Sequence, residues 1–265
     1  MRKRLAALAL GLTMMTGGAE AGELPVLQIE GEIVDAVSHV EYGTTYIGLR
    51  SVARALDETA AVTWEAGTAV VRTEALELKA VPGEKWIYAN GRYLYVPGGV
   101  QLSGGRTLLP IRVLADAFGA RVDWNGETGR ITVQDGEDAP VARYEEDTLY
   151  WLARIISAES RGESLRGQIA VGNVVLNRVK SPDFPNTVYD VVFDSRWGGQ
   201  FEPVRNGTIY SEPAAISVIA AKLCLEGADV AGKSLYFLDP AKAQNFWTVE
   251  NRPYLMSIGV HDFYG

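Results

Sequence analysis

An internal repeat in the first half of the chain most limits the folds that this sequence can adopt. The matching pairs are TYIGLRSVARAL (45–56) with TLLPIRVLADAF (107–118), VTW (62–64) with VDW (122–124), and IEGEIV (29–34) with ANGRYL (89–94). Each unit of about 60 residues contains a Gly turn between strands, a short helix, a Trp and a final strand. One such unit is too small to bury its apolar face alone, so the sequence predicts that two units form one domain.

The repeat also places a tryptophan at the same position in both units. Trp64 and Trp124 are equivalent residues. Large aromatic side chains that recur at equivalent positions are expected to fill the core. The alternative is that they are exposed platforms for sugar rings.

The segment after the repeat changes in character. QDGEDAPVARYEED at 134–147 contains Gly, Pro and six acidic residues, and it interrupts the apolar periodicity. We therefore expect a repeat domain at 22–135, a linker at 136–146 and a second domain at 147–265.

The N-terminus has the three parts of a secretory signal peptide. Three basic residues at 2–4 precede an apolar run at 5–15, and Ala-Glu-Ala follows at 19–21. We expect residues 1–21 to be removed and the protein to be secreted, with an uncleaved anchor as the alternative. Since no later stretch reaches the ~20 apolar residues of a membrane span, no stable membrane insertion is expected after cleavage.

Charge and reactive residues exclude several function classes. The net charge is −8; removing residues 1–21 takes away three basic residues and one acidic residue, leaving 22 Lys and Arg against 32 Asp and Glu. This balance disfavours nucleic acid and anionic membranes as partners. The two histidines lie in different halves, so we expect no metal and no cofactor. Cys224 is alone in an apolar stretch and is predicted to be a buried, inert thiol.

A carboxylate interrupts the apolar face of the first helix in the second half. Leu152, Ile155, Ile156 and Glu159 fall at i, i+3, i+4 and i+7, which is the spacing of one helix face. Burial would raise the pKa of Glu159 and allow it to act as a general acid. The alternative is a surface charge at a fraying helix end. Glu163 lies on no apolar stripe, so we expect it to be solvated.

Two further helices are predicted in the second half. SLRGQIAVGNVVLNRVK (164–180) has an apolar stripe, in which Gly172 would allow close packing. SEPAAISVIAAKLCLEG (211–227) has a Ser cap and an early Pro, and would end at Gly227.

Several motifs of the second half resemble the cell-wall hydrolase family that includes the spore cortex-lytic enzymes. They are LARIISAESRGESLRGQIAVGNVVLNRVKSPDFPNTVYDVVF (152–193), GGQFEPVRNGTIY (198–210), SLYFLDPAKA (234–243) and IGVHDFY (258–264). The resemblance implies a mainly helical, lysozyme-like α+β domain that is related to lytic transglycosylases and acts on the glycan strands of peptidoglycan. It also implies that Glu159 is the catalytic acid.

The implied reaction is cleavage between MurNAc and GlcNAc. Glu159 would first donate a proton and then act as base, giving 1,6-anhydromuramic ends. The alternatives are a water-using muramidase on the same fold and a non-catalytic wall-binding protein. A muramidase commonly uses a second carboxylate, for which Asp190, Asp194 and Glu202 are candidates.

Substrate-binding residues are expected in two of these motifs and beside the acid. The segment 198–210 would line the groove, although it can also be interpreted as a β-hairpin with NG as its turn. Tyr236 is expected to face the groove and Phe237 the core. His261 is expected to be buried and hydrogen-bonded. The candidate substrate-binding residues are Ser160, Gln200, Phe201, Asn206, Thr208, Tyr210 and Tyr236.

The repeat itself, over about residues 24–135, resembles the stalk-like domain named after the N-terminal region of copper amine oxidases. The resemblance implies an α+β domain with mostly antiparallel strands. The wall and a protein are the two partners open to this domain. The resemblance does not imply copper, because His39 is the only histidine in this half and copper sites use several.

Overall fold

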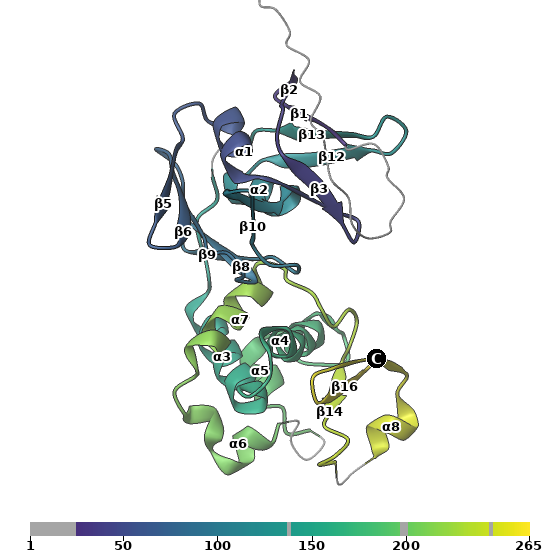
Figure 1. The fold of residues 1–265 in the computed structure, drawn as a ribbon. Helices are drawn as coiled ribbons and strands as arrows, with labels where there is room; N and C mark the ends of the chain where they lie inside the picture. Colours follow the sequence, from purple (N-terminus) through teal and green to yellow (C-terminus); the bar gives the residue numbers. More distant parts are fainter. Residues whose placement is uncertain (1–24, 137–138, 197–200, 244–245) are drawn as a thin grey trace, which may run out of the picture.

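The computed structural model describes residues 25–136, 139–196, 201–243 and 246–265. Figure 1 shows two layers, one above the other: sheets with two short helices in the first half, and a group of helices with a small sheet in the second. Each half has an apolar core of its own. The chain is therefore α+β, as predicted.

Three sheets and two helices form the N-terminal half. The sheet orders are β12-β13-β1-β2, β10-β11-β4-β3 and β5-β6-β7-β8-β9. Within them β1 and β13 are parallel, and the other described neighbours are antiparallel. The elements are β1 (Val26–Ile29), β2 (Glu32–Ile33), β3 (Ser38–Glu41), β4 (Thr44–Gly48), α1 (Leu49–Leu56), β5 (Ala61–Glu65), β6 (Thr68–Arg72), β7 (Glu77–Ala80), β8 (Trp86–Ala89), β9 (Arg92–Tyr95), β10 (Gln101–Ser103), β11 (Arg106–Pro110), α2 (Ile111–Phe118), β12 (Arg121–Asn125) and β13 (Arg130–Gln134).

The predicted repeat is present in the structure. Strand β4 leads into α1 as β11 leads into α2, and β4 and β11 pair antiparallel with Ile47 opposite Leu109. These two residues are equivalent in the repeat, so a local two-fold axis relates the units. The two matching hairpins turn at Glu30–Gly31 and Asn90–Gly91, where all four residues have positive φ, as in a type I′ turn.

The prediction that the two repeat tryptophans are core residues is wrong. Trp64 is 53% exposed and Trp124 is 51% exposed. Both lie on strands at a sheet edge, β5 and β12. From these strands Val62 and Val122 pack against the core, while the tryptophans remain accessible to solvent.

Helices α3, α4 and α7 form the centre of the C-terminal half. As predicted, Gly172 allows close packing, since a Cβ there would lie 2.7 Å from Cys224 Sγ and 2.8 Å from Ile156 Cδ1. A small sheet of order β14-β16-β15 stands beside α4. The elements are α3 (Glu146–Ser160), α4 (Leu165–Lys180), α5 (Val188–Val192), α6 (Glu202–Asn206), the 3-10 helix η1 (Thr208–Tyr210), α7 (Ala215–Leu225), β14 (Tyr236–Leu238), α8 (Trp247–Asn251), β15 (Tyr254–Ile258) and β16 (His261–Tyr264).

One predicted helix begins later than expected. α7 starts at Ala215 with Ala214 as its N-cap, so Ser211 does not cap it. Pro213 disfavours helical geometry at the residue before it. The N–H of Ala214 instead donates to Ser157 Oγ (3.0 Å), which fixes the start of α7 against α3.

The two halves are in direct contact. Trp86, Tyr93 and Tyr95 pack against the C-terminal core. Arg92, only 8% exposed, donates from Nε to Glu226 Oε2 (2.8 Å) and from Nη2 to Asp116 Oδ1 (3.1 Å). β9 therefore supplies both apolar and ionic contacts across the boundary.

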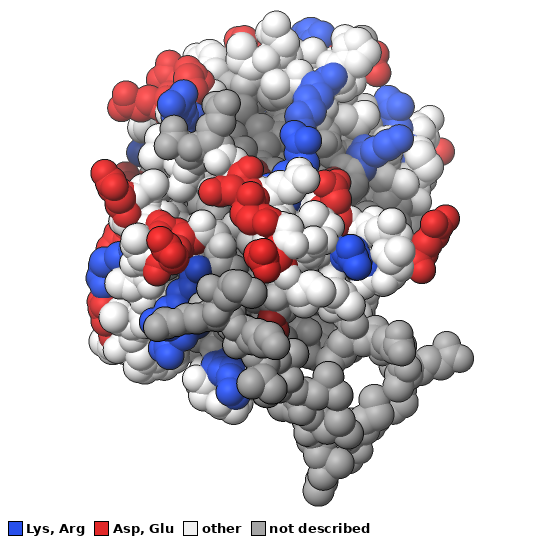
Figure 2. Space-filling model, turned by 90° about the horizontal axis from the view of Figure 1, so that it is seen from above, with Lys and Arg blue, Asp and Glu red and all other residues white. Residues whose placement is uncertain are grey.

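The surface carries charges of both signs. Figure 2, which views the molecule from above, shows acidic and basic side chains interspersed over this face. The coloured atoms form no continuous basic patch there. Within the described ranges, no helix is both long enough and apolar enough to pass through a membrane.

Candidate active site

Glu159 lies in the last turn of α3, on the face that packs into the core. Leu152, Ile155 and Ile156 on the same face are fully buried, and Glu159 itself is half-buried. Burial raises the pKa of Glu159, the negative charge of Glu202 adds to this and Arg178 opposes both, so that the pKa is about 7. The carboxyl group can therefore hold its proton near neutral pH, as a general acid must.

A polar pocket of about 340 Å³ opens beside Glu159. Helix α3 and the residue after it form one wall, and α6, η1 and residues 211–212, which precede α7, form the other. Its lining residues are Arg154, Ser157, Ala158, Glu159, Arg161, Glu202, Pro203, Asn206, Thr208, Ser211 and Glu212. The pocket therefore combines three glutamates, Glu159 among them, with amide, hydroxyl and guanidinium groups, which suit a hydroxyl-rich ligand.

Of the three candidate partner carboxylates, Glu202 shares this pocket with Glu159. Asp194 is 7% exposed and ion-paired with Arg196 Nη2 (2.9 Å), and that hydrogen-bonded pair lowers the pKa of Asp194. Asp190 accepts a hydrogen bond from Thr187 Oγ1 (2.6 Å) at the start of α5. The structure therefore brings Glu202, rather than the two aspartates, to the acid.

The described part of the segment predicted to be groove-lining or a hairpin, residues 201–210, is mostly helical. α6 ends at Asn206, Gly207 follows with φ of 82°, and η1 begins at Thr208, so the hairpin interpretation is wrong. Asn206 and Thr208 line the pocket as the groove interpretation expects. The N–H and hydroxyl of Thr208 both donate to Asn206 Oδ1 (3.0 and 2.7 Å), which holds the Asn206 amide in one orientation.

Phe201 and Tyr210, two other candidates of this segment, do not line the pocket. Phe201 is 3% exposed and packs in the core, 6.4 Å from the ring of Phe237, so its assignment to the groove is corrected. Tyr210 is 62% exposed and contacts the edge of Trp151 (6.2 Å between centroids). Gln200 lies outside the described residues.

Ser160 also differs from expectation. It is 3% exposed, and its hydroxyl donates to the carbonyl of Ile156 (2.7 Å) in the preceding helical turn. Successive residues of a helix point about 100° apart, so a residue next to Glu159 need not share its face. Ser157 is the serine of α3 that lines the pocket.

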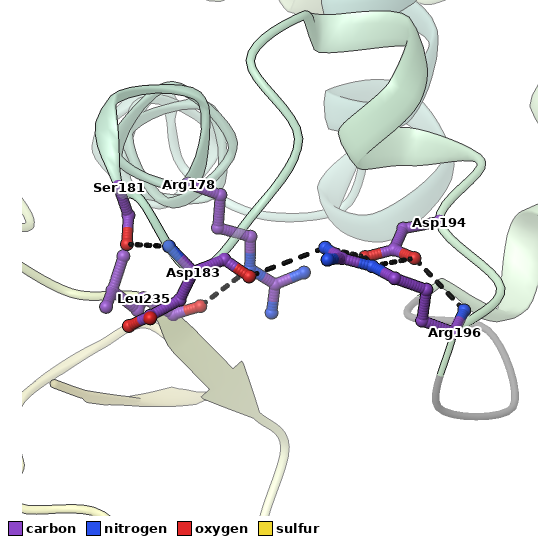
Figure 3. Close-up of polar contacts among 6 residues, drawn as sticks. All are labelled: Arg178, Ser181, Asp183, Asp194, Arg196 and Leu235. Carbon is purple, nitrogen blue, oxygen red and sulfur yellow. Dashed lines mark hydrogen bonds and ion pairs between the residues drawn. The ribbon is translucent and has the colours of Figure 1, made fainter.

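Arg178 is a functional candidate that sequence reasoning missed. It is 4% exposed, its Nε donates to the carbonyl of Leu235 (2.7 Å), and its Nη1 has no partner among the described residues. Figure 3 shows its guanidinium directed toward the Asp194–Arg196 pair. Burial lowers its pKa to about 10, so it stays cationic at neutral pH. The sequence does contain a signal for Arg178, because a charged residue occurs on the apolar stripe of α4. The same kind of signal identified Glu159 on α3.

Tyr236 on β14 lies between two cations. Arg178 is 5.5 Å and Arg252 is 4.8 Å from its ring centroid, and Trp247 is 6.4 Å away. Its ring is half-buried and does not line the Glu159 pocket. Phe237 contacts Phe263 (6.0 Å) within the apolar interior.

The structure differs from the sequence-based expectation at Glu163 and at His261. Glu163, expected to be solvated, is half-buried and accepts from the N–H of Val260 (3.3 Å), which ties α3's end to the β15–β16 turn. His261 is buried as expected, but its Nδ1 lacks a hydrogen-bond partner among the described residues, and burial lowers its pKa. Cys224 is buried as predicted, and burial raises the pKa of its thiol.

The described residues contain no group of three or more His, Cys, Asp or Glu side chains arranged to hold a metal. His39 of the N-terminal half stacks on Tyr46 (5.4 Å between centroids). One histidine with a stacked ring does not fit a copper site, which uses several nitrogen or sulfur ligands.

The fold and the pocket define an α+β protein whose helical half presents a protonatable carboxylate in a polar cavity. Two family models match separate parts of the chain: cell wall hydrolase at residues 162–264 and copper amine oxidase N-terminal domain at 28–133. The chain is 32% identical over 109 residues to the cell wall hydrolase CwlJ of Oceanobacillus iheyensis, covering 39% of this chain and 76% of that protein. The chain therefore belongs to the cell wall hydrolase family. The family-model match begins after Glu159 and does not include it.

Other relatives match the same half. The chain is 38% identical over 120 residues to a spore cortex-lytic enzyme of Bacillus cereus, covering 45% of each chain. A solved catalytic domain of the germination-specific lytic transglycosylase SleB from Bacillus anthracis is 37% identical, with a TM-score of 0.42, covering 46% of this chain and 97% of that one. The chain thus spans about half the length of the full-length Bacillus cereus relative.

Proposed function

We propose that the C-terminal half cleaves the glycan strands of peptidoglycan between MurNAc and GlcNAc, with Glu159 as the catalytic acid. The observation that supports this most is the half-buried Glu159, with a pKa of about 7, at the wall of a polar pocket. Membership of the cell wall hydrolase family supports the choice of polymer.

In the proposed reaction one carboxylate acts twice. Protonated Glu159 donates its proton to the glycosidic oxygen as the bond from that oxygen to muramic C1 breaks. The resulting carboxylate then accepts the proton of the muramic C6 hydroxyl while O6 bonds to C1. The products are a free GlcNAc hydroxyl and a 1,6-anhydromuramic end, no water is consumed, and Glu159 regains its proton.

The surrounding charges suit both steps. Glu202 raises the pKa of Glu159, which keeps the acid protonated before the reaction, and its negative charge would stabilise positive charge that develops at C1. Arg178 favours the ionised form of Glu159, which exists between the two steps. Asn206 and Thr208 are proposed to contact sugar hydroxyl or N-acetyl groups, and Tyr236 and Gln200 to extend the groove.

A water-using muramidase is the second candidate, because Glu202 lines the same pocket as Glu159. In that reaction Glu202 would either accept a proton from the attacking water as base or attack muramic C1 as nucleophile. Either reaction takes place at the wall, so we propose that the protein is exported, with residues 1–21 as its signal peptide. N-terminal sequencing of secreted protein that begins after residue 21 would support this.

Digestion of purified peptidoglycan, followed by mass spectrometry of the released fragments, tests the proposal. We expect anhydromuramic ends from the wild type and at least a 10²-fold loss of rate for Glu159→Gln, since general acid catalysis contributes 10²–10⁴-fold. Glu202→Gln should slow the reaction but still give anhydromuramic ends. Glu163→Gln is the matched control, because its side-chain oxygen can still accept from Val260.

The products separate the two reactions. Reducing muramic ends, together with loss of activity in Glu202→Gln, would assign the muramidase reaction instead. Binding of peptidoglycan without any release of fragments by the wild type would make the protein a non-catalytic wall-binding protein. Full activity of Glu159→Gln would refute the assignment of the acid.

A further inference from the structure

The exposed Trp64 belongs to a hollow in the N-terminal half. This hollow, of about 240 Å³, lies between the start of α1, the β5–β6 hairpin and the start of β11. Arg50, Ser51, Arg106 and Thr107 line it together with the indole of Trp64. A large aromatic ring that stays half exposed beside polar groups is typical of a binding surface.

The two arginines of this hollow have no acidic partners among the described residues. Neither Arg50 nor Arg106 makes an ion pair or a side-chain hydrogen bond to another described residue, and both are exposed. By contrast, the nearby Arg72 is paired with Glu65. In a chain with a net charge of −8, two guanidinium groups in one hollow that have no acidic partner in the described part of the chain make a local site for a carboxylate.

We infer that this hollow is a second binding site for peptidoglycan, with the indole of Trp64 against a sugar ring and Arg50 and Arg106 on a carboxylate of the attached peptide. An indole presents a flat apolar face to a sugar ring, and the hydroxyls of Ser51 and Thr107 can bond its polar groups. The choice of polymer rests on the proposed function of the C-terminal half.

The hollow is separate from the Glu159 pocket. Figure 1 places β5 in the upper layer and α6 at the opposite end of the molecule. A second contact on the same polymer would hold the catalytic half near its substrate, because linked binding sites raise each other's effective concentration.

Cosedimentation with insoluble peptidoglycan tests this inference without requiring activity. The full chain carries Glu159→Gln so that the polymer stays intact, and teichoic acids are removed from the polymer beforehand. We expect Trp64→Ala, and Arg50→Ala with Arg106→Ala, to weaken binding about three- to tenfold. Trp124→Ala is the matched control: it removes an equally exposed tryptophan, at the equivalent position, that does not line this hollow.

Several results would overturn the inference. These are unchanged binding of Trp64→Ala, an equal loss with Trp124→Ala, or binding by every variant to intact walls that is lost when the same walls are stripped of teichoic acids. The last result would assign teichoic acid as the ligand. Circular dichroism melting of each variant checks that the exposed substitutions leave the fold intact. The binding assay does not depend on catalysis, so its result would stand even if the wild type released no peptidoglycan fragments.

Discussion

The burial of Glu159 favours catalysis but lowers stability when the group is ionised. Burial penalises the ionised form, so Glu159 keeps the proton that a general acid must donate. The same penalty destabilises the folded protein at a pH where the carboxyl group loses that proton. The folded-state pKa of about 7 lies above the 4.5 of an exposed glutamate. Between these pH values the folded state binds the proton more tightly, so the free energy of unfolding falls as pH rises from about 4.5 through 7.

Glu159→Gln should therefore stabilise the protein at high pH while it removes activity. We expect its free energy of unfolding to exceed that of the wild type by about 1–3 kcal/mol at pH 8 and to equal it at pH 4, where both side chains are neutral. Urea denaturation at the two pH values measures this. The same difference at both pH values would mean that ionisation of Glu159 is not its cause.

Residue-scale prediction succeeded where a residue's face was fixed by its own helix. The i+3 and i+4 spacing placed Glu159 on the buried stripe, but it could not show that Ser160 turns to bond Ile156. Phe201 was misplaced for another reason: a polar neighbourhood in sequence suggested a groove, whereas packing against Phe237 buries it. The pairing of Glu159 with Glu202 depends on the position of α6, which no local pattern reveals.

At the scale of elements, the Asn206–Gly207 pair shows why one local sequence allows two structures. Asn-Gly is favoured in hairpin turns, and a left-handed glycine also commonly ends a helix. Here Gly207, with φ of 82°, ends α6. Local propensity does not determine whether Asn206–Gly207 forms a hairpin turn or ends a helix. The packing of α6 against α3 and η1 favours the helix end.

The contact of α4 with α3 and α7 depends on Gly172. Gly172→Val would place atoms against Cys224 and Ile156, so we expect it to lower the free energy of unfolding by about 1–3 kcal/mol. Gly162→Ala is the control, since a Cβ there meets no atom within 4 Å, and it should change stability by less than about 0.5 kcal/mol. Denaturant titration of both variants measures the difference; equal stability would contradict the tight contact.

At the scale of the whole molecule, the two halves are joined by more than the chain that connects them. The segment predicted as a linker also packs, because the N–H of Ala142 donates to the carbonyl of Asn90 (3.1 Å). We propose the division at residues 136–146 as the boundary between two domains with a shared, partly ionic interface.

Arg92 is the test of that interface. Arg92→Ala would leave the carboxylate of Glu226 without its partner at a nearly buried position, so we expect a loss of about 2–4 kcal/mol and two separate unfolding transitions. Arg72→Ala, which breaks an exposed ion pair with Glu65, should cause a much smaller loss and keep one transition. Calorimetry resolves the transitions, and a single unchanged transition for Arg92→Ala would show that this contact does not couple the unfolding of the two halves.

The sequence by itself determined the repeat, the class of both halves and the buried face that carries Glu159, because periodicity and turn residues act over a few neighbouring positions. Tertiary structure alone decided that Trp64 and Trp124 are exposed on edge strands, that Glu202 faces the acid and that Arg92 joins the halves. These outcomes depend on which elements pack together across long stretches of chain, and the free energy of that packing is not encoded in any single segment.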